Sequence, residues 1–363
     1  HDPNKLYTAS NHLHVTTNEG QSWKVISPDL TRNDSTKLGS SGGPITKDNT
    51  SVEYYCTIFA AAESPRVKDL LWTGSDDGLI HVSRDGGQNW TNVTPAFLPE
   101  WIQINSLEPD PHTDGGCYVA ATMYKSGDYK PYLLRTKDFG QTWQNITTGI
   151  DDHHFTRVIR SDPKAKGMLY AGTESGMYIS FDDGDHWQPF QMNLPIVPIT
   201  DLVIKNDNLI AATQGRSFWI VDELAHLRQM RDAKTDRFQF YQPADTYRMT
   251  GASYKSQEAG TNYQGGLMAF YYLPAELKKE DTLSITLLEQ DGDTIVKYST
   301  HHKEKPYQIS PKKGMNKFNW GLRYSPAKRF DGMVMWAGNL SGPRAIPGEY
   351  RIEVNYNDTI QSK

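Results

Sequence analysis

Short apolar runs alternate with polar turns along the first 250 residues, a pattern typical of β-strands rather than long helices. Runs such as 71–75 (LWTGS) and 169–173 (LYAGT) are each followed by a turn, a second short apolar run and another turn. A longer apolar run, such as 199–205 (ITDLVIK), separates one copy from the next. Four antiparallel strands per unit, repeated at this spacing, predict the blades of a β-propeller.

Four turns share a kernel, Ser/Thr-x-Asp-x-Gly-x-x-Trp. It begins at Ser83, Thr136 and Ser180 and, with Asn18 in the Asp position, at Thr16. The aspartate caps backbone N–H groups of a tight hairpin turn, and the glycine permits a positive φ there. The tryptophan is expected to return into the layer between blades. We therefore expect these kernel residues to stabilise the fold: Asp85, Asp138, Asp182, Trp23, Trp90, Trp143 and Trp187.

The number of repeats bears on how a propeller closes. The kernel tryptophans are 67, 53 and 44 residues apart, which corresponds to one blade plus loops of variable length. A fifth copy at 209–213 (LIAAT) leads into an eroded kernel at Asp222, so we expect four to five blades, the first beginning partway through its sheet. A partial ring leaves sheet edges bare, so we expect missing N-terminal blades or a partner chain to complete it. The opening HDP, in place of Met, indicates a processed or truncated product.

A second domain is expected after the propeller, which we place at 1–250. Residues 251–266 are polar and rich in glycine, which is typical of a linker. From 267 to 363, short strand-like runs alternate with turns, including a hairpin signal at Asp291-Gly292. The pattern predicts an immunoglobulin-like or fibronectin-like β-sandwich, complete or truncated, and therefore an all-β chain.

Composition and charge narrow the function classes. The net charge is −5 and the isoelectric point is near 6.1, so no basic surface field indicates nucleic acid. No run of about 18 apolar residues is present, so no transmembrane segment is expected. The two cysteines, Cys56 and Cys117, lie in apolar runs and are expected to be buried. Two thiols make neither a disulfide framework nor a metal site, so neither metal nor other cofactor is expected.

The kernels resemble the Asp boxes of BNR-repeat proteins, which include sialidases, xyloglucanase-type glycoside hydrolases and sortilin-type receptors. Longer stretches at 40–65, 74–78 (GSDDG), 155–163 (FTRVIRSDP) and 215–220 (GRSFWI) are more specific. They resemble a family of large secreted bacterial proteins, common in Bacteroidota, that are described as sortilin-like or as BNR-repeat glycosyl hydrolases. This resemblance implies a location outside the cytoplasm, secreted or on the cell surface or outer membrane of a bacterium.

Blade geometry indicates where a ligand would bind. In an up-and-down blade, the start of the innermost strand and the turn after the second strand lie on the face opposite the kernel turns. Acids, bases and aromatic rings on that face suit a sugar or a peptide. The candidates there are the catalytic carboxylates Glu174, Asp76 and Asp77 and the ligand-binding residues Arg157, Arg216, Glu53, Tyr124 and Trp101. We expect Arg157, Arg216, Glu174 and Asp76 to converge on one central depression.

Three functions are compatible with these residues. The leading hypothesis is a binding or scaffold propeller whose ligand is a peptide, a protein or a glycan, because the repeats carry no catalytic motif. The first alternative is a glycoside hydrolase in which Glu174 and Asp76 or Asp77 act as acid and base. A sialidase would need three arginines and a Tyr/Glu pair, and only Arg157 and Arg216 lie on the expected face. The second alternative is a subunit of an outer-membrane assembly.

Overall fold

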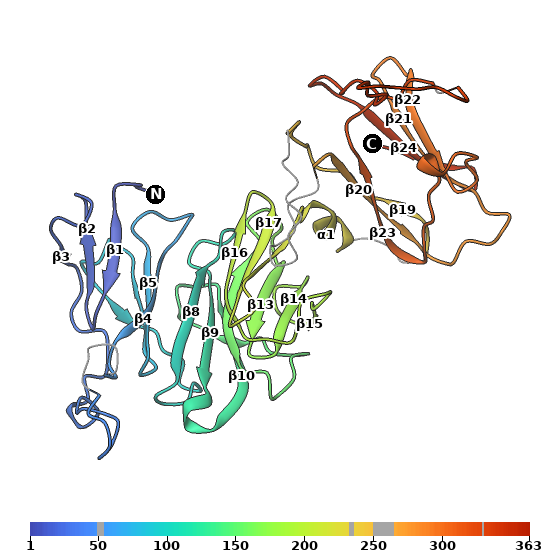
Figure 1. Ribbon diagram of the computed structural model, residues 1–363. Coiled ribbons are helices and arrows are strands. Elements are labelled where there is room, and N and C mark those ends of the chain that lie inside the picture. Colours follow the sequence, from blue (N-terminus) through green and yellow to red (C-terminus); the bar gives the residue numbers. More distant parts are fainter. Residues whose placement is uncertain (49–53, 232–235, 250–264, 329) are drawn as a thin grey trace. The chain divides into compact units, whose positions relative to one another are not determined.

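The computed structural model describes residues 1–48, 54–231, 236–249, 265–328 and 330–363. The chain divides into two compact units, His1–Val221 and Asp222–Lys363, and antiparallel strands are the main regular secondary structure of each (Figure 1). No helix among the described residues is long and apolar enough to cross a membrane.

The three central sheets of the first unit have four strands each, in a meander in which every strand pairs with the next. Their innermost strands contact one another, which places the sheets side by side as consecutive blades. The prediction of an all-β chain with propeller blades is confirmed. The strands of these sheets are β4 (Ile58–Glu63), β5 (Leu71–Ser75), β6 (Ile80–Ser83) and β7 (Thr91–Asn92); β8 (Gln103–Pro109), β9 (Cys117–Met123), β10 (Asp128–Thr136) and β11 (Gln144–Asn145); and β12 (Thr156–Ser161), β13 (Leu169–Thr173), β14 (Gly176–Ser180) and β15 (Gln188–Pro189).

The first and last sheets of this unit have three described strands each. In sequence and pairing, β1 corresponds to the second strand of the other blades, and β18 corresponds to a third strand. Strands β5 and β13 are buried throughout, whereas β1 is largely exposed, because no preceding sheet packs on the outer face of its sheet. The strands of these two sheets are β1 (Leu6–Ala9), β2 (Leu13–Thr16) and β3 (Lys24–Val25), and β16 (Ile199–Lys205), β17 (Asn208–Thr213) and β18 (Phe218–Val221).

The four kernel turns share one hydrogen-bond pattern. After β10, the Thr136 hydroxyl donates to Asp138 Oδ1 (2.8 Å) and accepts the N–H of Gly140 (3.0 Å). Asp138 Oδ1 also accepts the N–H of Thr142 (2.9 Å). The turns at Asp85 and Asp182 repeat these bonds, and Asn18 replaces the aspartate in the first copy. The glycine has φ +80°, and a Cβ on it would lie 2.7 Å from the side chain of Val93 in the preceding sheet.

Each kernel after the first is also bonded to the preceding sheet. A tryptophan indole N–H donates to a backbone carbonyl there, in the pairs Trp90 to Ile26 (3.0 Å), Trp143 to Val93 (2.7 Å) and Trp187 to Ile146 (2.6 Å). Every acceptor lies three positions after the kernel tryptophan of its own sheet. The same motif therefore supplies the acceptor for one blade interface and the donor for another. We call this contact the tryptophan lock.

Replacing Asp138 by Ala is expected to lower the free energy of unfolding by about 1 kcal/mol, as the loss of a capping side chain does elsewhere. Ligand affinity is expected to stay unchanged, because the turn lies at the end of the blade opposite the strand entries. Urea melts and a binding isotherm measure the two quantities. A loss of ligand affinity in the folded variant would contradict a purely structural role for this carboxylate.

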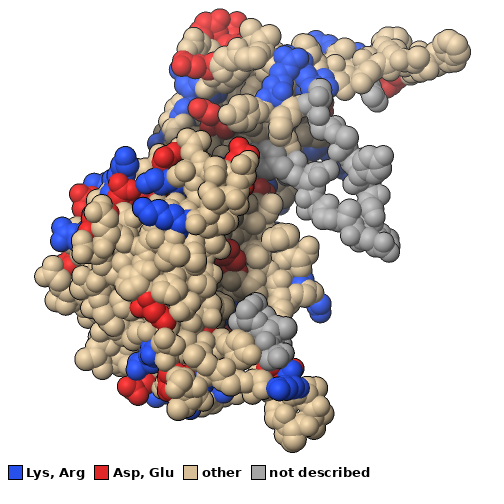
Figure 2. Space-filling view, turned by 90° about the vertical axis from the view of Figure 1, so that its left-hand side faces the viewer, with Lys and Arg blue, Asp and Glu red and all other residues tan. Residues whose placement is uncertain are grey.

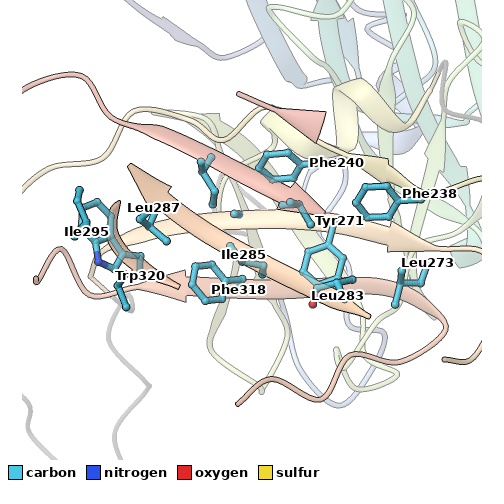
Figure 3. Close-up of a cluster of buried hydrophobic side chains, with 14 of the residues drawn as sticks. Phe238, Phe240, Tyr271, Leu273, Leu283, Ile285, Leu287, Ile295, Phe318 and Trp320 are labelled. Carbon is cyan, nitrogen blue, oxygen red and sulfur yellow. The ribbon is translucent and has the colours of Figure 1, made fainter. Parts of the chain in front are cut away.

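The second unit contains two antiparallel sheets that share one core (Figure 3). One sheet has the order β19-β20-β23 and the other β22-β21-β24-β25. Aromatic side chains of the first sheet, such as Phe318 and Trp320, pack with Leu283, Ile285 and Leu287 of the second. Two packed sheets are the architecture of a β-sandwich, and the immunoglobulin-like or fibronectin-like assignment stays a prediction. The elements are α1 (Ala225–Met230), β19 (Gln239–Phe240), β20 (Leu267–Leu273), β21 (Leu283–Leu288), β22 (Thr294–Ser299), β23 (Gly314–Trp320), β24 (Arg351–Tyr356) and β25 (Thr359–Ser362).

The division between the units falls earlier than residue 250, where we expect the propeller to end. Strand β19 lies within the range 1–250 that we assign to the propeller from the sequence, but it pairs with β20 of the second unit. Phe238 and Phe240 are buried in the core of the second unit, which draws the segment after Asp222 into that unit. Of the predicted linker 251–266, residues 251–264 lie outside the described residues.

Candidate functional site

The backbone places equivalent residues of three blades at one end of the first unit. The residue after each second strand donates its N–H to the carbonyl just ahead of the inner strand. These bonds join Asp76 to Thr57 (2.9 Å), Glu174 to Phe155 (3.0 Å) and Gln214 to Pro198 (3.0 Å). We call this end of the blades the entry face. The candidates Asp76 and Glu174 therefore occupy matching positions on it.

All four inner strands have a β-bulge at the same position of the entry face. In β4 the pairing passes from Ile58 opposite Ser75 to Ala60 opposite Gly74, which leaves Phe59 without a partner. Bulges re-aim side chains and are frequent next to binding sites. Because each of these inner strands is a sheet edge, the extra residue lies at the edge of its sheet in these four blades. The four bulged residues are Phe59, Asn105, Arg157 and Thr200.

Arg157 is the centre of a cluster of charged and aromatic groups. Its Nε and Nη2 lie 2.7 and 2.6 Å from Glu174 Oε2. Its guanidinium lies 5.7 Å from the ring centre of Tyr124 and 5.3 Å from that of Phe155. The two rings stack at 4.9 Å, and Tyr129 lies 6.1 Å from Phe155. The structure therefore brings together Arg157, Glu174 and Tyr124.

A second aromatic pair lies beside this cluster. Tyr55 meets Trp101 edge to face, with ring centres 5.9 Å apart. The cations of Arg32 and Lys37 lie 5.5 and 5.9 Å from the Trp101 ring. Tyr55, Trp101 and Tyr124 border one small hollow, and Tyr55 also borders a cavity of about 580 Å³ between the first two sheets. We call the rings of Tyr55, Trp101, Tyr124, Phe155 and Tyr129 the aromatic row.

The two adjacent aspartates of the second blade have different environments. Asp77 is fully buried and accepts hydrogen bonds from the Ser75 hydroxyl (2.5 Å) and the N–H of Arg32 (2.7 Å). It therefore holds the loop at Arg32, and its burial removes it from the catalytic candidates. Asp76 is half-buried and accepts the N–H of Thr57 (2.9 Å). Burial raises the pKa of the Asp76 carboxyl, and the charge of Asp77 adds to that effect.

The expected convergence of four residues is met only in part. Arg216 is exposed, and its guanidinium donates to the carbonyl of Gly215 (3.0 Å). Among the described residues, no ion pair or side-chain hydrogen bond joins it to Arg157, Glu174 or Asp76. Its long side chain turns back on its own turn, so the expectation of an inward Arg216 is not supported. Glu53 lies outside the described residues.

A second arginine links the inner strands further from the entry face. Arg160 donates to Ser106 Oγ (2.7 Å) on β8 and to Asp201 Oδ1 (2.7 Å) and the carbonyl of Leu202 (2.8 Å) on β16. It also lies 3.8 Å from Glu108. Burial raises the pKa of Glu108 to about 7 against the opposing effect of Arg160. This arginine therefore holds three inner strands together beneath the aromatic row.

Sequence reasoning missed Tyr55, Phe155 and the bulged Phe59 and Asn105. Phe155 carried a signal, because it lies two residues before Arg157 at a strand entry. The bulges have no signal in the sequence, because a strand with one extra residue contains the same types of residue as a strand without it.

The comparisons with known proteins find two curated relatives. The chain is 29% identical over 131 residues to an oligoxyloglucan-reducing end-specific xyloglucanase of Emericella nidulans, a match covering 34% of this chain and 15% of that protein. It is 27% identical over 161 residues to sortilin of Mus musculus, covering 44% of this chain and 18% of that protein. The chain thus matches less than a fifth of the length of either relative. No family model matches.

Solved structures with similar parts include carbohydrate-acting and peptide-bound proteins. The GH74 xyloglucanase from Xanthomonas campestris superposes with a TM-score of 0.46 at 15% identity, over 74% of this chain and 40% of that one. A structure of YCF48 bound to D1 peptide superposes with a TM-score of 0.36 at 20% identity, over 46% of this chain and 51% of that one.

Proposed function

We propose that this chain is the binding part of a secreted or cell-surface bacterial protein of the sortilin-like, BNR-repeat kind. Its ligand is a segment of a peptide, a protein or a glycan held on the entry face. The observation that carries the proposal is the aromatic row with Arg157 among its rings. Tyr55 and Tyr129 are exposed, Trp101 and Tyr124 are half-buried, and Phe155 is buried. Accessible rings with cations beside them bind amino-acid side chains, ring faces of sugars and backbone amides at little cost in conformational entropy.

The charges of the site favour binding over catalysis. Both nitrogens of Arg157 that face Glu174 are within 2.7 Å of its carboxylate, so this acid is already engaged. Asp77 is buried. A hydrolase of the two-carboxylate type needs a pair of free acids across the scissile bond, and of the three candidates only Asp76 is both partly exposed and outside an ion pair.

Replacing Tyr124 by Ala tests the site, with immobilised arrays of linear peptides and of xyloglucan oligosaccharides as probes. We expect affinity for any array member that binds the native chain to fall about tenfold, equivalent to about 1.4 kcal/mol from one lost ring contact. Tyr247→Ala is the matched control, because Tyr247 is 83% exposed and lies in the second unit. Equal affinity of the two variants would contradict a ligand on the aromatic row.

A glycoside hydrolase is the second candidate, and the raised pKa of Asp76 favours it. A carboxyl group that stays protonated above its usual range can act as a general acid. The partial match to a xyloglucanase names a substrate to try first. Release of reducing ends from xyloglucan by the native chain, abolished by Asp76→Asn in a folded variant, would replace the binding proposal with this one.

A further inference from the structure

The first sheet carries half of a tryptophan lock. Trp23 is 42% exposed, and its indole N–H has no hydrogen-bond partner among the described residues. A Cβ on Gly87 would meet the carbonyl of Ile26 in the preceding sheet at 2.6 Å. A Cβ on Gly20, by contrast, would have only the Trp23 ring within 4 Å. The first sheet therefore has the indole donor and the glycine of the tryptophan lock, but the described residues contain no sheet that supplies the acceptor carbonyl.

The flank around Trp23 is apolar and unpartnered. Leu6 is 57% exposed and Val25 is 52% exposed. At the positions that match Leu6, Leu71 is 2% exposed and Leu169 is fully buried. Figure 2, viewed from the side on which the first sheet lies, shows a broad uncharged area with charged side chains toward its margins. This flank continues the series of blade interfaces that the next three sheets bury.

The residues before β1 have the geometry of a turn that follows an inner strand. The N–H of Asn4 donates to Asp2 Oδ1 (3.0 Å). After inner strand β12, the N–H of Lys164 donates to Asp162 Oδ1 (2.8 Å) in the same way. The sequence repeats too, because Asp-Pro occurs at 2–3, 110–111 and 162–163. Residues 2–4 therefore form the turn that follows an inner strand in the other blades.

We propose that the outer flank of the first sheet is the docking face for one more kernel blade, with an inner strand that pairs with β1 at the edge that the first sheet leaves open. The backbone carbonyl three residues after that blade's kernel tryptophan accepts the indole N–H of Trp23. A second copy of this chain cannot supply the acceptor. Its own acceptors are filled by Trp90, Trp143 and Trp187, and the exposed flank of its last sheet ends at a third strand.

The test is an extended chain in which a repeat of residues 102–168 directly precedes Leu6. The repeat supplies a four-stranded blade with its acceptor at Ile146, followed by an inner strand and its turn. Acrylamide quenching is compared with that of the Trp23→Phe variant, which isolates the contribution of Trp23. We expect Trp23 quenching to fall roughly fivefold from that of the unextended chain, because the matching Trp187 is 5% exposed.

Three results would overturn the proposal. The first is a folded extended chain in which Trp23 stays as accessible to acrylamide as in the unextended chain. The same conclusion follows if Ile146→Asp within the repeat leaves the quenching of Trp23 unchanged. The second is a dimer of the unextended chain, by light scattering, that Trp23→Asp dissociates, because the occupant is then a second copy.

The third concerns a shorter extension that remains informative if the long repeat does not fold. Residues 150–168, placed directly before Leu6, supply only the inner strand and its turn. We expect the amides of β1 to gain protection from hydrogen exchange while Trp23 stays accessible. No gain in protection would overturn the proposal.

Discussion

Replacing Trp187 by Ala is expected to lower the free energy of unfolding of the first unit by about 3–5 kcal/mol, the usual cost of removing a large buried aromatic side chain. Trp187 is 5% exposed and packs in a core that draws on the third and fourth sheets. The substitution leaves a cavity between these sheets. It also removes the hydrogen bond to the carbonyl of Ile146. Urea melts of the native chain and the variant, followed by circular dichroism, measure the loss of free energy of unfolding.

Trp23→Ala is the matched control for this prediction. It removes the same residue from the same motif, but from a flank that no sheet covers, so we expect a loss under about 1 kcal/mol. A loss under about 1 kcal/mol for Trp187→Ala as well would mean that the kernels are not core elements. Equal large losses would mean that Trp23 is buried in solution, which contradicts the exposed flank.

The Glu108→Gln variant is expected to remove part of the pH dependence of stability. The pKa of this carboxyl is raised from about 4.5 to about 7 in the folded chain. Between these values the folded state holds a proton that the unfolded state has lost. Stability is therefore full below about pH 4.5 and falls as the pH rises through 7, by about 3 kcal/mol at most. The variant, neutral throughout, lacks this fall.

The measurement is the difference between native and variant unfolding free energies from pH 4.5 to 8. A difference is needed because His81 and His226 work in the opposite direction. Burial lowers the pKa of both histidines from 6.5 to about 4. The stability that they contribute is therefore lost as the pH falls from about 6.5 to about 4. Glu304→Gln, at an exposed position, is the control. A constant difference across the range would show that Glu108 is ionised in the folded chain.

The kernels were predictable from sequence because their bonds are local. Asp138 binds groups within four residues of itself, so the residue types alone specify the turn. The burial of Asp77 could not be predicted, because its hydrogen-bond partner Arg32 lies 45 residues away in the sequence. The bulge at Arg157 could not be predicted for another reason. The register of strand pairing, and not the composition of the strand, decides which residue has no partner. The prediction placed the domain boundary too late for the same reason, because strand pairing joins β19 to β20 of the second unit.

The direction of the tryptophan lock has a consequence for synthesis on the ribosome. Every indole reaches back to a carbonyl nearer the N-terminus, in the order Ile26, Val93 and Ile146. When a kernel leaves the ribosome, the sheet that receives it has already been made. Because translation is slow compared with the formation of a hairpin, the blades can assemble one at a time, each on a finished surface. On the growing side, each finished blade is covered by the next one, and the face of the newest blade is the one left exposed to other nascent chains.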